Sequence, residues 1–158
     1  MPRFSKTLRV PYGPDECFRL VSDIARYPYF IRWITALRVS EQRTTGPGVQ
    51  ECLGEVVVGF RGFSERFSTR VTADEPARRV TAALVRGPFR RLFAEWRITE
   101  SIAGASDVSL EINYEFRNPV IGLLAAANHD MAVDRILNAF LEEARRRYGR
   151  RPSASAPE

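Results

Sequence analysis

Histidine and cysteine, the residue types used most often for proton transfer, nucleophilic attack and zinc binding, are scarce in this 158-residue chain. His129 is the sole histidine, and its neighbours Asn128 and Asp130 would not face it on a helix. Cys17 and Cys52 lie far apart and lack metal-ligand spacing. One histidine and two separated cysteines do not make a typical zinc site. We therefore predict no catalytic residue, no metal site and no disulfide.

The aromatic side chains are a stronger indication of a site, because pockets for apolar ligands are mostly hydrophobic with few orienting polar groups. Aromatic and large apolar residues recur after Pro28 and along the later segments. They could form an ordinary core or the wall of a cavity. The candidate ligand-binding residues are Tyr27, Phe30, Trp33, Phe60, Phe67, Leu84, Phe89, Leu92, Trp96, Tyr114, Phe116, Leu124, Asn128 and Met131. The candidate orienting polar groups are Ser68 or Thr69, Tyr114, Asn128 and His129.

The length and the hydrophobic content of 44% predict one folded domain with a substantial core. The longest apolar run is far shorter than the roughly 20 residues of a membrane-spanning helix. The first residues, MPRFSKTLRV, contain no apolar signal region. We predict a cytoplasmic protein, and a peripheral position at the inner membrane stays open.

The net charge is +5, and Lys6 is the only lysine beside many arginines. This charge could serve solubility alone, attract anionic lipid headgroups or bind RNA, and solubility is the favoured explanation. Arginines cluster at Arg86, at Arg90 and Arg91, and at 145–147 with 150–151. The last cluster would end a helix, where positive charge complements the helix dipole. Membrane docking is the second explanation.

The elements that would position these residues follow from periodicity and turn signals. Residues 3–10 alternate as a half-buried strand, and Pro14 with two following carboxylates begins a short helix. Pro28 is expected to end that helix and to separate it from a second one at about 28–33. Glycine and proline then divide six predicted strands, at about 35–45, 49–60, 63–74, 78–86, 91–101 and 106–117.

A final helix of about 30 residues is predicted from Pro119 to a cap at Gly149, with Asn118 as its N-cap. The chain is expected to form one domain over 1–149 and a disordered polar tail over 150–158. The apolar positions of this helix include Val120, Leu124, Ala127, Met131, Val133, Leu137, Phe140, Ala144 and Tyr148.

This order of elements predicts an α+β fold, in which a seven-stranded antiparallel sheet covers its apolar face with the long helix. Periodicity alone does not tell a cavity between sheet and helix from a filled core.

Three segments carry a family resemblance: RVPYGPDECFRLVSDIARYPYFIRWITALRV (9–39), GFRGFSERFSTRV (59–71) and RGPFRRLFAEW (86–96). In this order they resemble the coenzyme Q-binding branch of the START-like, helix-grip superfamily of polyketide cyclases and dehydrases. That branch includes mitochondrial coenzyme Q chaperones and bacterial RatA proteins. The resemblance covers roughly residues 3–149. It implies a helix-grip fold, in which a curved sheet wraps the C-terminal helix and leaves a ligand cavity between them.

The resemblance also implies a carrier of hydrophobic molecules rather than an enzyme. It would need no cofactor, would bind ubiquinone or a related polyprenyl lipid, and would act as a quinone chaperone in respiration. Two alternatives stay open. Polyketide cyclases and aromatases share the fold but need polar groups in the cavity, and RatA-type proteins interfere with the joining of ribosomal subunits. The expected partners are a quinone or lipid and an anionic membrane contacted by arginines; the ribosome is less favoured, and no DNA partner is expected.

Overall fold

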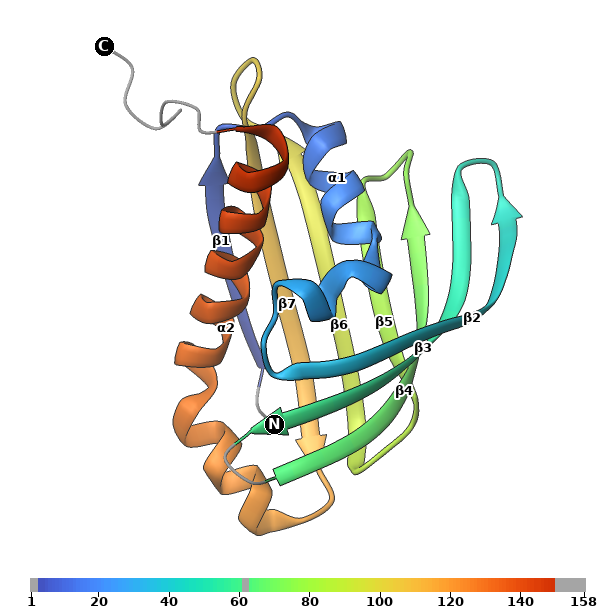
Figure 1. Cartoon of the computed structure of the whole chain (residues 1–158), viewed down its shortest axis with the longest axis vertical. Coiled ribbons are helices and arrows are strands. Elements are labelled where there is room, and N and C mark those ends of the chain that lie inside the picture. The colour runs from blue at the N-terminus through green and yellow to red at the C-terminus, as the bar shows by residue number, and fades with distance from the viewer. Residues whose placement is uncertain (1–2, 61–62, 150–158) are drawn as a thin grey trace.

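The computed structural model describes residues 3–60 and 63–149, so the predicted tail lies outside the described residues. Within these ranges, the side chains of residues 3, 4, 60, 63, 125, 126 and 128–132 are also outside the description. The elements in chain order are β1 (Arg3–Val10), α1 (Pro14–Ser22), the 3₁₀ helix η1 (Ile24–Tyr29), β2 (Ile34–Gly46), β3 (Val49–Phe60), β4 (Phe63–Asp74), β5 (Arg79–Arg86), β6 (Phe89–Glu100), β7 (Ser106–Phe116) and α2 (Pro119–Tyr148) (Figure 1).

The seven strands form one antiparallel sheet in the order β1-β7-β6-β5-β4-β3-β2. Strands β2 to β7 follow one another as a meander, and β1 pairs with β7, so the two ends of the chain meet at one side of the sheet. The predicted α+β architecture is confirmed, and the strand boundaries agree with the predicted ones to within two residues.

The sheet is curved, because several of its ladders change register. Shifts interrupt the β2–β3 ladder in three places, the β4–β5 ladder at Ser68/Thr69 and the β6–β7 ladder at Phe89/Arg91. An extra residue on one strand bends that strand and increases its twist. Figure 1 shows β2 and β3 sweeping round toward α2, so that the sheet encloses the helical elements on its concave side.

The short helices α1 and η1, together called the lid, connect β1 to β2. Two helices were predicted here, but the predicted position of the second, 28–33, is wrong. The break falls at Asp23, and Pro28 lies inside η1. A 3₁₀ helix of two turns tolerates proline because only one backbone donor is lost. The backbone N–H groups of Phe30 and Ile31 then both donate to the carbonyl of Tyr27, closing the turn.

Helix α2 has the predicted caps. The Asn118 carboxamide oxygen accepts hydrogen bonds from the backbone N–H groups of Val120 and Ile121, at 2.9 and 3.5 Å. Gly149 ends the helix with a φ of 83°, and its N–H donates to the carbonyl of Arg145. Proline at the start and glycine at the end match the usual asymmetry of helix termini.

The two halves of α2 differ in burial. The buried apolar residues of its described part are Val133 at the middle of the helix and Leu137, Phe140 and Ala144 in the second half. Val120 and Leu124, which belong to the same series of apolar positions, are exposed. Figure 1 shows the first turns of α2 reaching past the ends of the strands.

Among the residues described, no helix combines the length and apolar character needed to cross a bilayer. The cytoplasmic location stays a prediction.

Candidate ligand-binding cavity

A cavity of about 220 Å³ lies between the concave face of the sheet, the lid and α2. Its wall is formed by η1 and the segment after it, by strands β2 to β7 and by the second half of α2. Most lining side chains are apolar, so the space suits a hydrophobic molecule. The lining residues are Ile24, Tyr27, Ile31, Trp33, Ile34, Leu37, Gly54, Val56, Phe67, Thr69, Val71, Val80, Thr81, Ala82, Leu92, Ala94, Trp96, Leu110, Ile112, Ile136 and Phe140.

Thr69 on β4 is the buried polar side chain in the described part of this wall, with 5% of its surface exposed. Its partner in the β3–β4 ladder is Gly54. A Cβ atom at Gly54 would lie 3.5 Å from Oγ1 of Thr69 and 3.4 Å from Cδ1 of Ile24. The missing side chain therefore leaves space beside the hydroxyl group, which can donate a hydrogen bond to a ligand carbonyl.

Phe140 of α2 anchors the lid and the sheet to each other through aromatic contacts. Its ring centroid lies 4.6 Å from that of Trp96 on β6, 5.1 Å from that of Tyr27 and 5.0 Å from that of Phe30. The contacts with the two lid rings are edge-on, an arrangement that aromatic pairs prefer to face-to-face stacking. One helical residue thus connects β6 to the segment that contains Tyr27 and Phe30.

Tyr27 presents its ring, and not its hydroxyl group, to this site. The hydroxyl donates to the backbone carbonyl of Val21 at the end of α1. Burial, reinforced by the nearby carboxylate of Asp23, raises the pKa of Tyr27 well above its usual range. The phenol of Tyr27 therefore stays neutral, and its proton makes a hydrogen bond within the lid.

Five of the predicted ligand-binding residues line the cavity: Tyr27, Trp33, Phe67, Leu92 and Trp96. Phe30 does not line it but supports the wall through its contacts with Phe140 and Tyr27. These residues could be predicted from the sequence because they are aromatic or large and lie on predicted strands or beside Pro28. Contact between any of them and a ligand stays a prediction.

Three further candidates form a row of rings that continues from the cavity wall at Phe67. The centroids of Phe67 and Phe89 are 5.4 Å apart, those of Phe89 and Phe116 4.5 Å, and those of Phe116 and Tyr114 5.6 Å. The row ends beside the first turns of α2, since the Cβ of Phe116 lies 3.9 Å from the position that a Cβ of Gly122 would take. A row of contacting rings thus runs from the cavity wall to the start of α2.

The remaining candidates lie elsewhere. Leu84 pairs with Thr69 in the β4–β5 ladder but is outside the cavity wall, and Leu124 is half exposed on α2. The side chains of Phe60, Asn128 and Met131 lie outside those that the structure describes, as does that of His129.

The candidate list also missed part of the wall. Ile24, Ile31 and Leu37 were not named, because they read as ordinary apolar residues of a helix, a connection and a strand. Gly54 carried a usable signal, since glycine within a strand often marks a place where something approaches the backbone closely.

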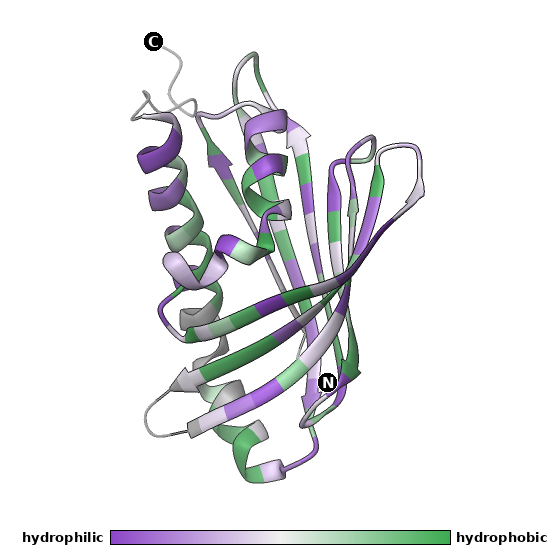
Figure 2. Cartoon of the chain, turned by 45° about the vertical axis from the view of Figure 1, so that its right-hand side comes forward, coloured by the Kyte–Doolittle hydropathy of each residue, from purple (hydrophilic) through white to green (hydrophobic). Residues whose placement is uncertain are grey.

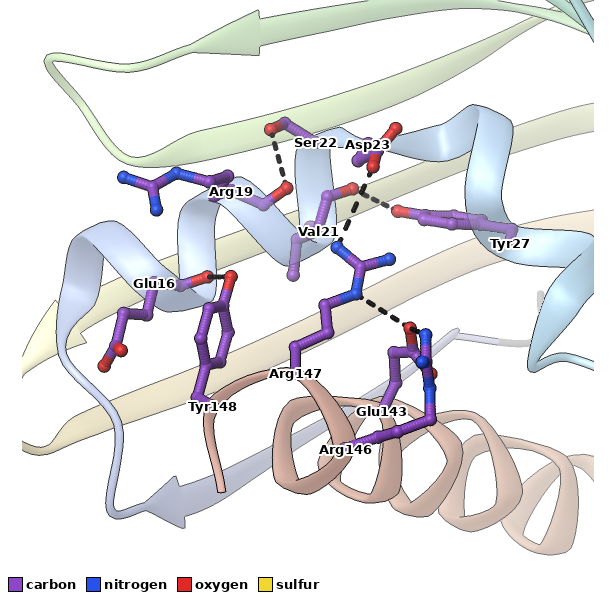
Figure 3. Close-up of polar contacts among 10 residues, drawn as sticks. All are labelled: Glu16, Arg19, Val21, Ser22, Asp23, Tyr27, Glu143, Arg146, Arg147 and Tyr148. Carbon is purple, nitrogen blue, oxygen red and sulfur yellow. Dashed lines mark hydrogen bonds and ion pairs between the residues drawn. The ribbon is translucent and has the colours of Figure 1, made fainter. Parts of the chain in front are cut away.

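A group of polar contacts joins the C-terminal end of α2 to the lid (Figure 3). Nη1 of Arg147 lies 3.8 Å from a carboxylate oxygen of Asp23, and Nε of Arg147 donates to Glu143 at 2.7 Å. The Tyr148 hydroxyl donates to the carbonyl of Glu16 at 3.3 Å. We call these five residues, with Tyr12 and Gly149, the clasp; the Tyr12 hydroxyl donates to the carbonyl of Gly149 at 2.7 Å.

The clasp contains a nearly buried carboxylate. Glu143, 5% exposed, accepts hydrogen bonds from Nε and Nη2 of Arg146 at 2.9 and 2.6 Å besides that from Arg147. The hydrogen bond from Arg146 is the largest cause of a lowered Glu143 pKa, and Arg147 contributes to it. Arg145 pairs with Glu142. The arginines of 145–147 are therefore all engaged in ion pairs, and that of Arg147 with Asp23 reaches beyond α2.

Within the described ranges, no group of three or more His, Cys, Asp or Glu side chains is arranged to hold a metal ion. Neither Cys17 nor Cys52 forms a disulfide bond, and Cys17 is buried. The arrangement offers an apolar cavity with a hydroxyl group on its wall.

Comparisons with known proteins agree with this geometry. Residues 10–141 match the family described as polyketide cyclase/dehydrase and lipid transport. The chain belongs to this family. The helix-grip fold is likewise shared with the aromatase/cyclase ZhuI of Streptomyces sp. R1128, whose structure superposes with a TM-score of 0.80 at 19% identity over 92% of this chain and 94% of that one. At that identity the likeness concerns the fold alone.

Other members of the family are closer in sequence. The ribosome association toxin RatA of Escherichia coli K12 is 29% identical over 96% of this chain and 92% of its own length. The mitochondrial coenzyme Q-binding protein of Schizosaccharomyces pombe is 30% identical over 86% of this chain and 82% of its own. An 18 kDa protein of Caulobacter crescentus is 35% identical, with a TM-score of 0.81 over 95% and 100% of the two chains. The predicted kinship with coenzyme Q-binding and RatA proteins is confirmed.

Proposed function

We propose that this protein binds the headgroup of ubiquinone, or of a related polyprenyl lipid, in the cavity and acts as a quinone chaperone. The observation that carries the proposal is an apolar cavity of about 220 Å³ with the Thr69 hydroxyl on its wall. Similarity to the coenzyme Q-binding protein of S. pombe supports the choice of ligand.

The cavity volume limits how a quinone would bind. A cavity of about 150 Å³ lined by Leu, Ile and Phe holds benzene in another protein. A volume of about 220 Å³ therefore accepts one substituted ring and little more. The polyprenyl tail must leave the cavity, and each buried methylene that it keeps contributes about 0.8 kcal/mol. The headgroup would sit beside Thr69, whose hydroxyl would donate to a quinone carbonyl.

Binding can be followed through the protein's own fluorescence. The chain has two tryptophans, Trp33 and Trp96, and both line the cavity. Titration with a short-tailed ubiquinone is expected to quench the fluorescence of both tryptophans, and the quenching should saturate at one ligand per protein. A titration without saturable quenching, made on protein first stripped of lipid, would contradict the proposal.

A matched pair of variants separates cavity binding from adsorption. Ala82→Leu places three more carbons in the cavity wall, whereas Ala36→Leu makes the same change on the exposed surface of β2. Overfilling should weaken quinone binding by about tenfold or more, and the control should bind as the wild type does. If both variants bind quinone with equal affinity, the ligand must bind outside the cavity.

The Thr69 hydroxyl has its own test. Thr69→Val keeps the shape and removes the donor, so affinity should fall about fivefold, as expected for one hydrogen bond of about 1 kcal/mol. Thr72→Val, three residues further along β4, is the control and is not a lining residue. A loss of the same size in both variants would assign no orienting role to Thr69.

Ribosome association is the second candidate function. It is favoured by the 29% identity to RatA of E. coli over nearly the whole chain and by the net charge of +5. Sedimentation with ribosomal subunits at moderate salt would test it. Binding to subunits by a protein that fails the quinone titration would replace the chaperone proposal with this one.

We do not propose a cyclase, because the described wall offers one buried hydroxyl where directed ring closure would need several polar groups.

A further inference from the structure

We infer that one end of the molecule is a membrane-docking surface, made of the β5–β6 turn and the first turns of α2. We call these segments, residues 85–90 and 117–124, the foot. The inference deepens the proposed function and rests on it in one respect, since a carrier of a bilayer lipid must reach the bilayer. The partner to which we commit is a lipid surface with anionic headgroups.

The first observation is exposed apolar surface on one side of a helix. Val120 is 64% exposed, Leu123 73% and Leu124 51%. Residues spaced by three and four positions share one face of a helix. Figure 2 shows these first turns as a largely hydrophobic stretch at the lower end of the molecule. Val85, on the neighbouring turn, is also half exposed. Large aliphatic side chains held outward together mark an interaction surface.

The second observation is charge. The sequences of the foot, VRGPFR and RNPVIGLL, contain three arginines and no acidic residue. Arg86, Arg90 and Arg117 are all exposed. The nearby Arg91 pairs with Glu115, whereas Arg86 and Arg90 belong to no ion pair found among the described residues. Aliphatic side chains bordered by arginines complement a bilayer with anionic headgroups, because the former can insert while the latter meet phosphates.

The third observation is that the two segments form one unit. The backbone N–H of Arg117 donates to the carbonyl of Pro88 at 2.9 Å, and its Nε donates to the carbonyl of Phe89 at 3.1 Å. The Asn118 cap then starts α2 directly beside the turn. The apolar residues and the arginines are thus held together at one end of the molecule.

The fourth observation connects the foot to the cavity. The row of rings Phe67, Phe89, Phe116 begins at the cavity wall and ends against the first turns of α2 at Gly122. A tail that leaves the cavity along this row would emerge at the foot. Docking there lets a polyprenyl chain pass between protein and bilayer without crossing water.

Among the residues that the structure describes, the opposite end of the molecule lacks this combination. The arginines of 145–147 are paired with Glu142 and Glu143, and the exposed Ile102 stands in a turn between β6 and β7. That end therefore supplies matched controls for the test.

The test is co-sedimentation of the full chain with vesicles, one set of phosphatidylcholine alone and one containing phosphatidylglycerol. We expect the wild type to bind the anionic vesicles, and to bind less when about 1 M salt shortens the screening length to about 3 Å. Arg86→Gln with Arg90→Gln should weaken binding about thirtyfold, at about 1 kcal/mol for each arginine near an anionic surface. Val120→Ser with Leu123→Ser should weaken it at least about tenfold.

The controls make the same chemical changes away from the foot. They are Ile102→Ser, and Arg19→Gln with Arg38→Gln, all at exposed positions. They should bind vesicles as the wild type does. All these variants replace exposed side chains, so they should keep the wild-type stability to within about 0.5 kcal/mol.

Two results would overturn the inference. One is an equal loss of vesicle binding in the foot and control variants, and the other is a wild-type protein that does not bind anionic vesicles. A dimer that dissociates in the foot variants, seen by sedimentation velocity, would assign the surface to a second copy instead. The quinone titration without vesicles is independent of this test. Quinone binding without vesicle binding leaves the proposed function standing, and vesicle binding that requires the foot supports docking even if quinone does not bind.

Discussion

The two halves of α2 belong to one helix but are held in different ways. The second half buries Leu137, Phe140 and Ala144 and is tied to the lid by the clasp. The first half is held by its cap at Asn118 and carries exposed Val120 and Leu123. Burial along one continuous helix is therefore decided by which part of the protein lies opposite each of its turns. The second half of α2 contributes to the cavity wall, whereas the described apolar side chains Val120 and Leu123 of its first turns are exposed.

The largest expected effect is the removal of the aromatic anchor. Phe140→Ala deletes the ring that contacts Trp96, Tyr27 and Phe30, and should lower the free energy of unfolding by about 3–5 kcal/mol. Leu123→Ala, an equally apolar truncation on the first half, should change it by less than about 0.5 kcal/mol. Urea denaturation measures both. Comparable losses would mean that the first half is packed as tightly as the second.

The next effect concerns the carboxylate in the clasp. Glu143→Gln removes the charge that Arg146 and Arg147 share, and at pH 7 should cost about 1–2 kcal/mol of stability. Glu142→Gln is the matched control. The Glu142 carboxylate is 62% exposed and pairs with Arg145. Glu142→Gln should therefore lower the free energy of unfolding by no more than about 0.5 kcal/mol. An equal loss of stability in both variants would show that the ion pairs of Glu143 contribute no more than an ordinary surface ion pair.

The Glu143 contribution should also depend on pH. Hydrogen bonds from Arg146 and Arg147 hold its pKa in the folded protein below the ordinary value of 4.5. A depressed folded pKa gives stability that is fully present above the unfolded pKa and is lost as pH falls through the folded one. The stability difference between wild type and Glu143→Gln should therefore shrink below about pH 4.5. A difference that stays constant down to acid pH would contradict the assignment.

The smallest expected effect lies at the start of α2. Asn118→Ala removes the N-cap, worth about 1 kcal/mol, so amide exchange at the first turn should rise about fivefold. Because nothing in the described structure buries Val120 and Leu123, global stability should change by less than about 0.5 kcal/mol. Asn138→Ala, an exposed position in the second half, should leave that exchange unchanged. A large global loss in Asn118→Ala would mean that the cap supports the core.

Much of the fold was predictable because its strands alternate and its turns contain glycine or proline. The errors have local causes. Pro28 was read as a break, but a short 3₁₀ helix accommodates it. Val120 and Leu124 have the same spacing as residues that are buried further along α2, and a sequence pattern does not reveal where the sheet ends.

The cavity was less predictable than the fold. Trp33, Phe67 and Trp96 were named for their aromatic character, and the structure places them in one wall. Phe89 and Phe116 look alike in the sequence but lie in the row beyond it, because register and curvature decide which inward-facing rings surround the space. The space beside Thr69 depends on the absence of a side chain at Gly54 in the neighbouring strand.

The most direct test of the central claim is to identify what the protein carries. The protein would be purified without detergent and weighed by native mass spectrometry, and then extracted with organic solvent so that any released molecule can be identified. We predict one quinone or polyprenyl lipid per chain, lost in the Ala82→Leu variant and kept in Ala36→Leu. A protein that is empty after purification and also fails to take up added ubiquinone would contradict the account.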